Sequence, residues 1–132
     1  MDKVCHFEVP YDDKDRMESF YSGVFGWQFA PSPGDVPYTF AFTTEVNEQM
    51  MPKEAGGING GTYQRAPEEA PVSRSPVIVI EVDDCAQKIK DIEAAGGANV
   101  MGPQPVGDMG IYAQVKDTEG NIIGLWQSLG PG

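Results

Sequence analysis

His6 is the only histidine of the chain, and it stands two residues before Glu8 in a segment with strand-like alternation. Side chains two residues apart share one face of a strand, so the imidazole and the carboxylate are expected to point the same way. An imidazole titrates near neutral pH and can act as a general base. It can equally be a hydrogen-bonded part of a cavity wall. Cys5 falls on the opposite face, which argues against a Cys-His couple.

A second carboxylate, Glu81, closes a similar strand at residues 77–82. Aligning the two strand ends places Glu8 on Glu81 and His6 on Val79. The two carboxylates could clamp a cationic ligand, or they could be solvated or capping residues at strand ends. A metal site of His6, Glu8 and Glu81 is conceivable as a hypothesis.

One strand ending occurs twice, at residues 57–64 and 120–127, with glycine on glycine, aromatic on aromatic and glutamine on glutamine. A chain built from two copies of one unit must bury the face where the copies meet, which is a natural place for a pocket. Alternation groups Asn59, Gly61 and Tyr63 in the first copy, and Ile122, Gly124 and Trp126 in the second. The glycines either make room for a ligand or ease sheet curvature. The aromatic residues either stack on a flat ligand or belong to the core.

The spacing of apolar residues predicts the order strand, helix, strand, strand, strand in each half. The first half has strands at 4–9, 27–29, 38–44 and 58–64, and a helix that runs from the Asp12-Asp13 cap to Gly26 and buries one apolar stripe. The second has strands at 77–82, 98–101, 111–115 and 122–127, and a helix between Asp83-Asp84 and Gly96-Gly97. Residues 1–132 are therefore expected to form one domain, with module one at 1–64, a linker at 65–75 and module two at 76–132.

The chain has 132 residues, a net charge of −11 and no cluster of Lys or Arg. This balance argues against binding to nucleic acid or to an anionic membrane. No apolar run approaches the roughly 18 residues of a membrane span. Two cysteines, Cys5 and Cys85, are too few for a disulfide scaffold, which favours a reduced, cytoplasmic protein.

Three motifs carry a family resemblance: His6-Phe7-Glu8-Val9-Pro10, Phe20-Tyr21-x-x-Val24-Phe25-Gly26-Trp27 and Asp117-x-Glu119-Gly120-Asn121. Together with the order of elements, they resemble the vicinal oxygen chelate superfamily. That group includes glyoxalase I, extradiol dioxygenases and the bleomycin- and fosfomycin-resistance proteins. The resemblance implies an α+β fold in which two tandem βαβββ modules form a curved, half-barrel-like mixed sheet around a shared cavity.

The resemblance also implies where metal ligands would stand. In glyoxalase I they come from the first and last strand of each module, and those positions map to Val4, Gly61, Val77 and Gly124. None of these side chains can bind a divalent cation. We therefore expect a protein with no metal and no cofactor. The resemblance to the bleomycin-resistance proteins implies that it binds a small, partly aromatic or cationic molecule between its modules.

The residues expected to contact this molecule are His6, Glu8, Asn59, Gly61, Tyr63, Val79, Glu81, Gly124 and Trp126. The alternative is a lyase, isomerase or dioxygenase with an unusual site in which His6 is catalytic. A third reading is an accessory or regulatory module. Because this architecture commonly dimerises, a homodimer is expected.

Overall fold

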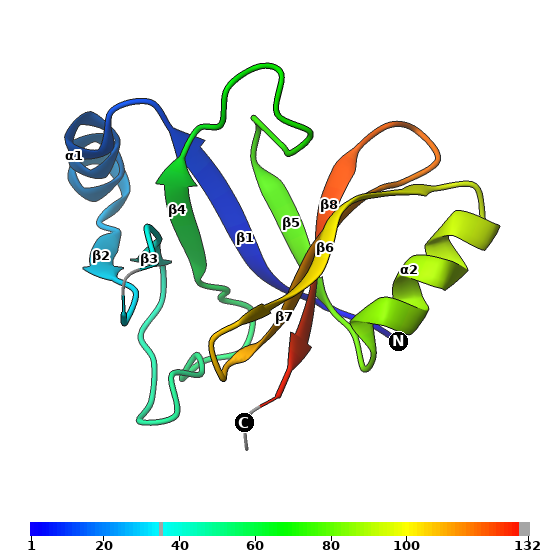
Figure 1. Cartoon of the computed structure of the whole chain (residues 1–132). Coiled ribbons are helices and arrows are strands. Elements are labelled where there is room, and N and C mark those ends of the chain that lie inside the picture. Colours follow the sequence, from blue (N-terminus) through cyan, green and yellow to red (C-terminus); the bar gives the residue numbers. More distant parts are fainter. Residues whose placement is uncertain (35, 130–132) are drawn as a thin grey trace. The chain divides into compact units, whose positions relative to one another are not determined.

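The computed structural model describes residues 1–34 and 36–129, and its elements are labelled in Figure 1. The chain divides into two compact units. Unit one consists of Met1–Cys5, Pro67–Ser73 and Val77–Gly132, and unit two of His6–Ala66 and Arg74–Pro76. No helix of the described part is long and apolar enough to cross a membrane.

Unit two carries the first module. Its elements are β1 (Val4–Tyr11, which starts in unit one), α1 (Lys14–Phe25), β2 (Gln28–Pro31), β3 (Thr39–Phe42) and β4 (Gly60–Gln64). The strand order is β2-β3-β4-β1, in which β4 runs parallel to β1 and antiparallel to β3. The first copy of the repeated ending is therefore β4, the strand that pairs with the first strand of its module.

Unit one carries the second module, which consists of β5 (Val77–Glu81), α2 (Cys85–Ala94), β6 (Ala98–Val106), β7 (Gly110–Lys116) and β8 (Ile122–Ser128). Its strand order is β5-β8-β7-β6, and β8 is parallel to β5. The start of β1 lies beside β5 in this unit, where the Glu81 amide donates to the Lys3 carbonyl at 2.9 Å. The predicted α+β fold, with a mixed eight-stranded sheet and two βαβββ-like modules, is confirmed.

Local signals fixed both helix starts as expected. The Asp13 carboxylate accepts the Arg16 backbone N–H at 3.0 Å, and the Asp84 carboxylate accepts that of Gln87 at 3.1 Å. Each acceptor satisfies an amide that has no partner inside its helix. Helix α1 ends at Gly26, whose φ of 77° lies in the left-handed region that glycine tolerates best.

The two helices pack differently. Helix α2 buries Cys85 and Ile89 in a core with Val82, Ala113, Val115 and Leu125. Helix α1 buries no residue completely, and Phe20, Val24 and Phe25 of its predicted stripe are exposed. The expectation of a buried stripe was therefore wrong. This helix meets the sheet through ring contacts instead. The ring of Tyr21 stacks on that of Trp27 with centroids 4.6 Å apart, and the Trp27 ring is tilted against that of Phe7 in β1 with centroids 5.4 Å apart.

Strand β6 extends to Val106, five residues beyond the predicted end at Met101. Strand β6 lies at the edge of the sheet, where proline is tolerated, and its pairing with β7 contains two register shifts.

Candidate ligand-binding site

Strand register brings several predicted residues onto one face of unit two. Glu8 pairs with Gly61, Pro10 with Tyr63, and Phe40 of β3 with Gly61. Because directly opposed residues share a face and alternate residues return to it, this face carries five of the predicted or neighbouring side chains. They are His6, Glu8, Tyr38, Phe40 and Tyr63. We call this surface the His6 face.

A direct hydrogen bond joins His6 to a residue that the sequence analysis did not select. The Nε2 atom of His6 lies 2.8 Å from the hydroxyl oxygen of Tyr38, and the two rings are nearly parallel with centroids 6.4 Å apart. Burial lowers the pKa of His6 from 6.5 to about 4. The imidazole is therefore neutral at pH 7, where it can either accept the phenolic proton or donate its own.

Tyr38 also explains why residue 61 is a glycine. A Cβ at position 61 would overlap the hydroxyl oxygen and Cζ of Tyr38, far inside van der Waals contact. The phenol therefore occupies the space that a side chain at position 61 would need. The sequence analysis offered two roles for this glycine: to make room for a ligand or to ease the curvature of the sheet. The structure favours the first kind of role, but the group that uses the room is the side chain of Tyr38.

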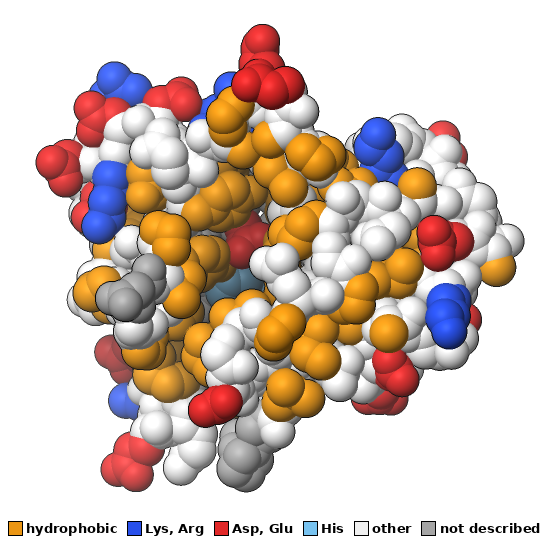
Figure 2. All heavy atoms as spheres, in the orientation of Figure 1, with side chains coloured by type: hydrophobic (Ala, Val, Ile, Leu, Met, Phe, Trp, Pro, Cys, Tyr) orange, Lys and Arg blue, Asp and Glu red, His pale blue; other side chains and the backbone are white. Residues whose placement is uncertain are grey.

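The rest of the His6 face is largely aromatic. Tyr38 and Tyr63 are stacked with centroids 6.5 Å apart and an interplanar angle of 12°. Phe40 meets Tyr38 edge to face at 6.0 Å, and Phe42 continues the row at 6.2 Å from Phe40. Figure 2 shows the pale-blue atoms of the single histidine among orange side chains. Glu8, only 6% exposed, adds a buried carboxylate to this face.

Asn59 contributes an amide group whose oxygen has hydrogen-bond partners and whose nitrogen has none among the described residues. Its Oδ1 accepts the backbone N–H groups of Thr43 at 2.8 Å and Thr44 at 3.0 Å. Its Nδ2 is buried and has no hydrogen-bond partner among the described residues. Counting back two residues on each strand from the Glu8–Gly61 pair sets Asn59 beside His6. An unsatisfied donor thus lies next to the histidine, which is unusual because buried polar groups are normally paired.

In unit one a tyrosine again covers the corresponding glycine. Gly124 of β8 is buried, and a Cβ there would lie 3.1 Å from Val79 and 3.2 Å from the ring and hydroxyl of Tyr112. The Tyr112 hydroxyl accepts a hydrogen bond from the Gln114 side chain at 2.9 Å. Val79 is 1% exposed and is therefore a packed residue of the sheet.

The last two predicted residues of unit one lie close to each other. Glu81 pairs with Trp126 across β5 and β8. Its carboxylate lies 3.9 Å from the Lys3 ammonium group, with 40% of the side chain exposed, which fits the interpretation as a solvated strand-end residue. The Trp126 ring packs on Gly110, where a Cβ would approach it to 2.5 Å.

The alignment of Glu8 with Glu81 and of His6 with Val79 was wrong. Glu8 stands opposite the glycine of β4, and the residue opposite the glycine of β8 is Val79. Glu8 therefore corresponds to Val79, and His6 to Val77. If Val77 is the first-strand ligand position of the second module, the equivalent position in the first is His6 and not Val4.

Even with His6 at a ligand position, the side chains do not fit the ligand set that the resemblance implies. Both last-strand positions are glycines packed against tyrosine rings, and the fourth position is the buried Val77. Within residues 1–34 and 36–129, no group of three or more His, Cys, Asp and Glu side chains is arranged to hold a metal ion.

Sequence reasoning missed Tyr38 and Tyr112. Each tyrosine covers a glycine on a nearby strand, Gly61 or Gly124. A sequence can indicate such a pair only when the register between the strands is known. The cavity expected between the modules stays a prediction.

Comparisons with known proteins agree with this architecture. No curated protein matches the sequence. A hypothetical protein from Bacillus halodurans C-125 is similar with a TM-score of 0.65 at 15% identity, covering 99% of this chain and 97% of its own. A variant of methylmalonyl-CoA epimerase from Streptomyces coelicolor gives 0.63 at 14% identity, covering 97% and 98%.

A glyoxalase/bleomycin resistance protein/dioxygenase superfamily member from Vibrio splendidus 12B01 gives 0.57 at 13% identity, covering 97% and 99%. At these identities the likenesses show the fold alone. The family is shown by the sequence itself, because residues 3–125 match the model of the "Glyoxalase/Bleomycin resistance protein/Dioxygenase superfamily". The chain belongs to this superfamily.

Proposed function

We propose that this protein binds a small, planar aromatic molecule on the His6 face without the help of a metal ion. The observation that carries the proposal is the position of Tyr38. Its hydroxyl fills the space above Gly61 and bonds to His6, the single imidazole of the chain. Tyr38 thus occupies the space that a carboxylate side chain at position 61 would need. It also forms a hydrogen bond with the Nε2 atom of His6, which a metal ion would otherwise bind.

The aromatic row supports a flat ligand. Tyr38, Tyr63 and Phe40 are each half-buried, so their rings keep surface on which a planar molecule can pack. Aromatic pairs contribute about 0.5–1.5 kcal/mol beyond the area they bury. A ligand that stacks on two rings would gain enough from this face for a weak to moderate affinity.

Asn59 supports a hydrogen-bond acceptor on that ligand. A buried amide donor without a partner costs about 1–3 kcal/mol. A carbonyl oxygen or ring nitrogen of a bound molecule would recover this cost. Glu8 on the same face favours a neutral or cationic ligand over an anionic one.

The metal part of the proposal is tested by elemental analysis of protein purified without chelators from medium supplemented with Zn, Mn, Fe and Ni. We expect less than stoichiometric metal in every preparation. A bound ion at one per chain, lost in His6→Ala, would overturn it.

The binding part is tested by thermal shift with neutral, cationic and anionic aromatic compounds, because a ligand of the native state raises the melting temperature. We expect Tyr63→Ala and Asn59→Ala to weaken the shift. Phe25→Ala, which removes an exposed ring of α1, is the matched control. Equal loss in the control, or no shift with any compound, would contradict the proposal.

The His6–Tyr38 hydrogen bond favours one second candidate, a proton-transferring enzyme such as an isomerase or lyase. A neutral imidazole bonded to a phenol is an acid–base pair. In that case Tyr38→Phe, which keeps the ring and removes the hydroxyl, would abolish turnover of a bound compound but leave its binding intact. The expected homodimer is a further proposal, checked by light scattering of the purified protein.

A further inference from the structure

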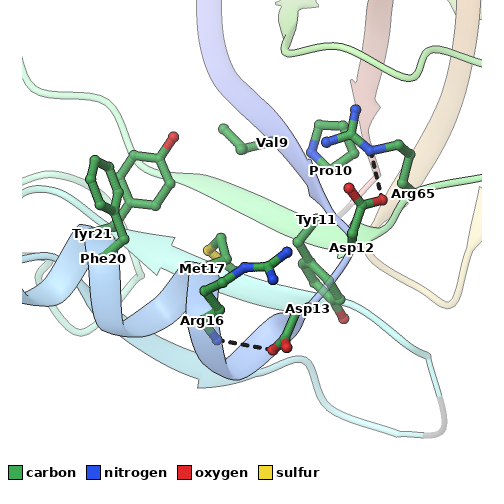
Figure 3. A pocket seen from close by; sticks show the side chains of 10 residues that line it. All are labelled: Val9, Pro10, Tyr11, Asp12, Asp13, Arg16, Met17, Phe20, Tyr21 and Arg65. Carbon is green, nitrogen blue, oxygen red and sulfur yellow. Dashed lines mark hydrogen bonds and ion pairs between the residues drawn. The ribbon is translucent and has the colours of Figure 1, made fainter.

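Unit two has a pocket of about 370 Å³ that uses neither His6 nor the aromatic row. It is formed by the end of β1, the first turns of α1 and Arg65, as Figure 3 shows. We call it the α1 pocket. Its volume lies at the lower end of the range of about 300–1,000 Å³ that is typical of small-molecule sites.

Two carboxylates at this pocket already have partners within the protein. Asp12 accepts the Arg65 Nε–H at 3.0 Å, and the Arg65 guanidinium also donates to the carbonyl of Arg74. Asp13 caps α1 through the backbone N–H of Arg16. These bonds use one oxygen of each carboxylate and fix the positions of both acids at the pocket.

The guanidinium of Arg16 is in the opposite situation. It projects into the pocket in Figure 3, and its side chain has no hydrogen bond or ion pair with residues 1–34 or 36–129. Arg65 is committed to Asp12, so Arg16 is the cation that remains for a ligand. A guanidinium presents paired N–H groups that match the two oxygens of a carboxylate.

The other wall of the pocket is apolar. Met17 and Tyr21 are half-buried on α1, and Phe20 is 54% exposed at the rim, with its ring 5.1 Å from that of Tyr21. Val9 of β1 completes this wall. An exposed aromatic ring next to an unpaired guanidinium offers one surface to a hydrocarbon group and one to an anion.

We propose that the α1 pocket binds a small aromatic carboxylate, with its carboxylate on Arg16 and its ring on Met17, Phe20 and Tyr21. A doubly charged phosphate fits less well. Only one guanidinium is unpaired, two aspartates flank it, and the chain carries a net charge of −11. The proposal does not depend on the His6 face, because the two sites share no side chain.

The test uses sodium benzoate as the probe, with acetate and benzyl alcohol as controls that remove the ring or the charge. Binding is followed by the amide chemical shifts of the full chain in NMR. We expect benzoate to shift amides of residues 16–21 at millimolar concentration, and both controls to bind at least about tenfold more weakly.

Arg16→Gln should weaken benzoate about tenfold, and Arg16→Lys should recover part of the loss because it keeps the charge without the fork. Lys14→Gln is the matched control. It removes the same charge from the same helix, but Lys14 pairs with Glu18 and does not line the pocket.

Three results would overturn the proposal. They are an equal effect of Lys14→Gln, equal affinity for benzyl alcohol and benzoate, and benzoate shifts that appear at residues 59–63 in place of α1. The absence of any shift at 20 mM benzoate, roughly the weak end of ligand binding, would overturn it as well.

Discussion

Replacing Gly61 by alanine tests the central packing claim with a single methyl group. The new Cβ would overlap the hydroxyl oxygen and Cε1 of Tyr38. No small adjustment relieves contacts this short, so the phenol must leave its place. Its hydrogen bond to His6 breaks when it does.

The cost follows from three contributions. Overpacking an interior costs about 1–3 kcal/mol, and losing one hydrogen bond costs about 0.5–1.5 kcal/mol. Replacing a glycine within a strand by alanine raises the free energy of unfolding by about 0.5–1 kcal/mol. The free energy of unfolding of Gly61→Ala should therefore fall by about 2 kcal/mol, which lowers the melting temperature by about 8 °C.

The assay is urea denaturation of the variant next to two matched glycine variants. Gly124→Ala meets its nearest atoms at 3.1–3.2 Å, so it needs only a small shift and should cost less. Gly23→Ala has nothing within 4 Å and stands inside α1, so it should stabilise the protein by about 0.5–1 kcal/mol.

A double-mutant cycle with Tyr38→Ala decides the cause. If the tyrosine ring is the obstacle, Gly61→Ala becomes neutral or stabilising once that ring is gone. A cost that stays the same in both backgrounds would refute the reasoning, and so would a cost no larger than that of Gly124→Ala.

Three further outcomes are expected. Because burial lowers the pKa of His6 from 6.5 to about 4, the unfolded chain takes up a proton that the folded chain does not as the pH falls between these values. The free energy of unfolding should drop there by up to about 3 kcal/mol, and His6→Gln should lack this part of the drop. Burial raises the pKa of the thiols of Cys5 and Cys85, so a thiol reagent at pH 7.5 should label both slowly in the native protein and fast in urea. Ile89→Ala, at a core position, should lower the free energy of unfolding by about 2–4 kcal/mol, whereas Ile78→Ala, at a half-exposed one, should cost less than about 1 kcal/mol.

Local chemistry made much of this fold predictable. The caps Asp13 and Asp84 and the glycine stop at Gly26 act within one helical turn, so the sequence contains everything that fixes them. The strand endings repeat because each pairs in parallel with the first strand of its module. Such features depend only on residues close together in the sequence and on the alternation of side chains along a strand, so they can be predicted without knowing the fold.

The errors arose where two separate segments must be placed against each other. Both Glu8 and Glu81 stand near the end of a strand, so their sequences align, but register depends on the partner strand and shifts the match to Val79. Likewise, the apolar spacing of residues 14–25 correctly predicted a helix. Whether its stripe is buried depends on Trp27 and Phe7, which already fill the contact with the sheet.

The same limit kept Tyr38 out of the predicted site, and it has a consequence for the chemistry of this fold. Gly61, Tyr38 and His6 depend on each other: the glycine gives the phenol its place, and the phenol gives the imidazole a partner. Gly61→Glu alone would drive a carboxylate into the ring. Tyr38→Ala alone would leave a void above a glycine and a histidine without its bond. A carboxylate at position 61 can face His6 only after both changes together, and each single change gives a protein that is less stable than the present one.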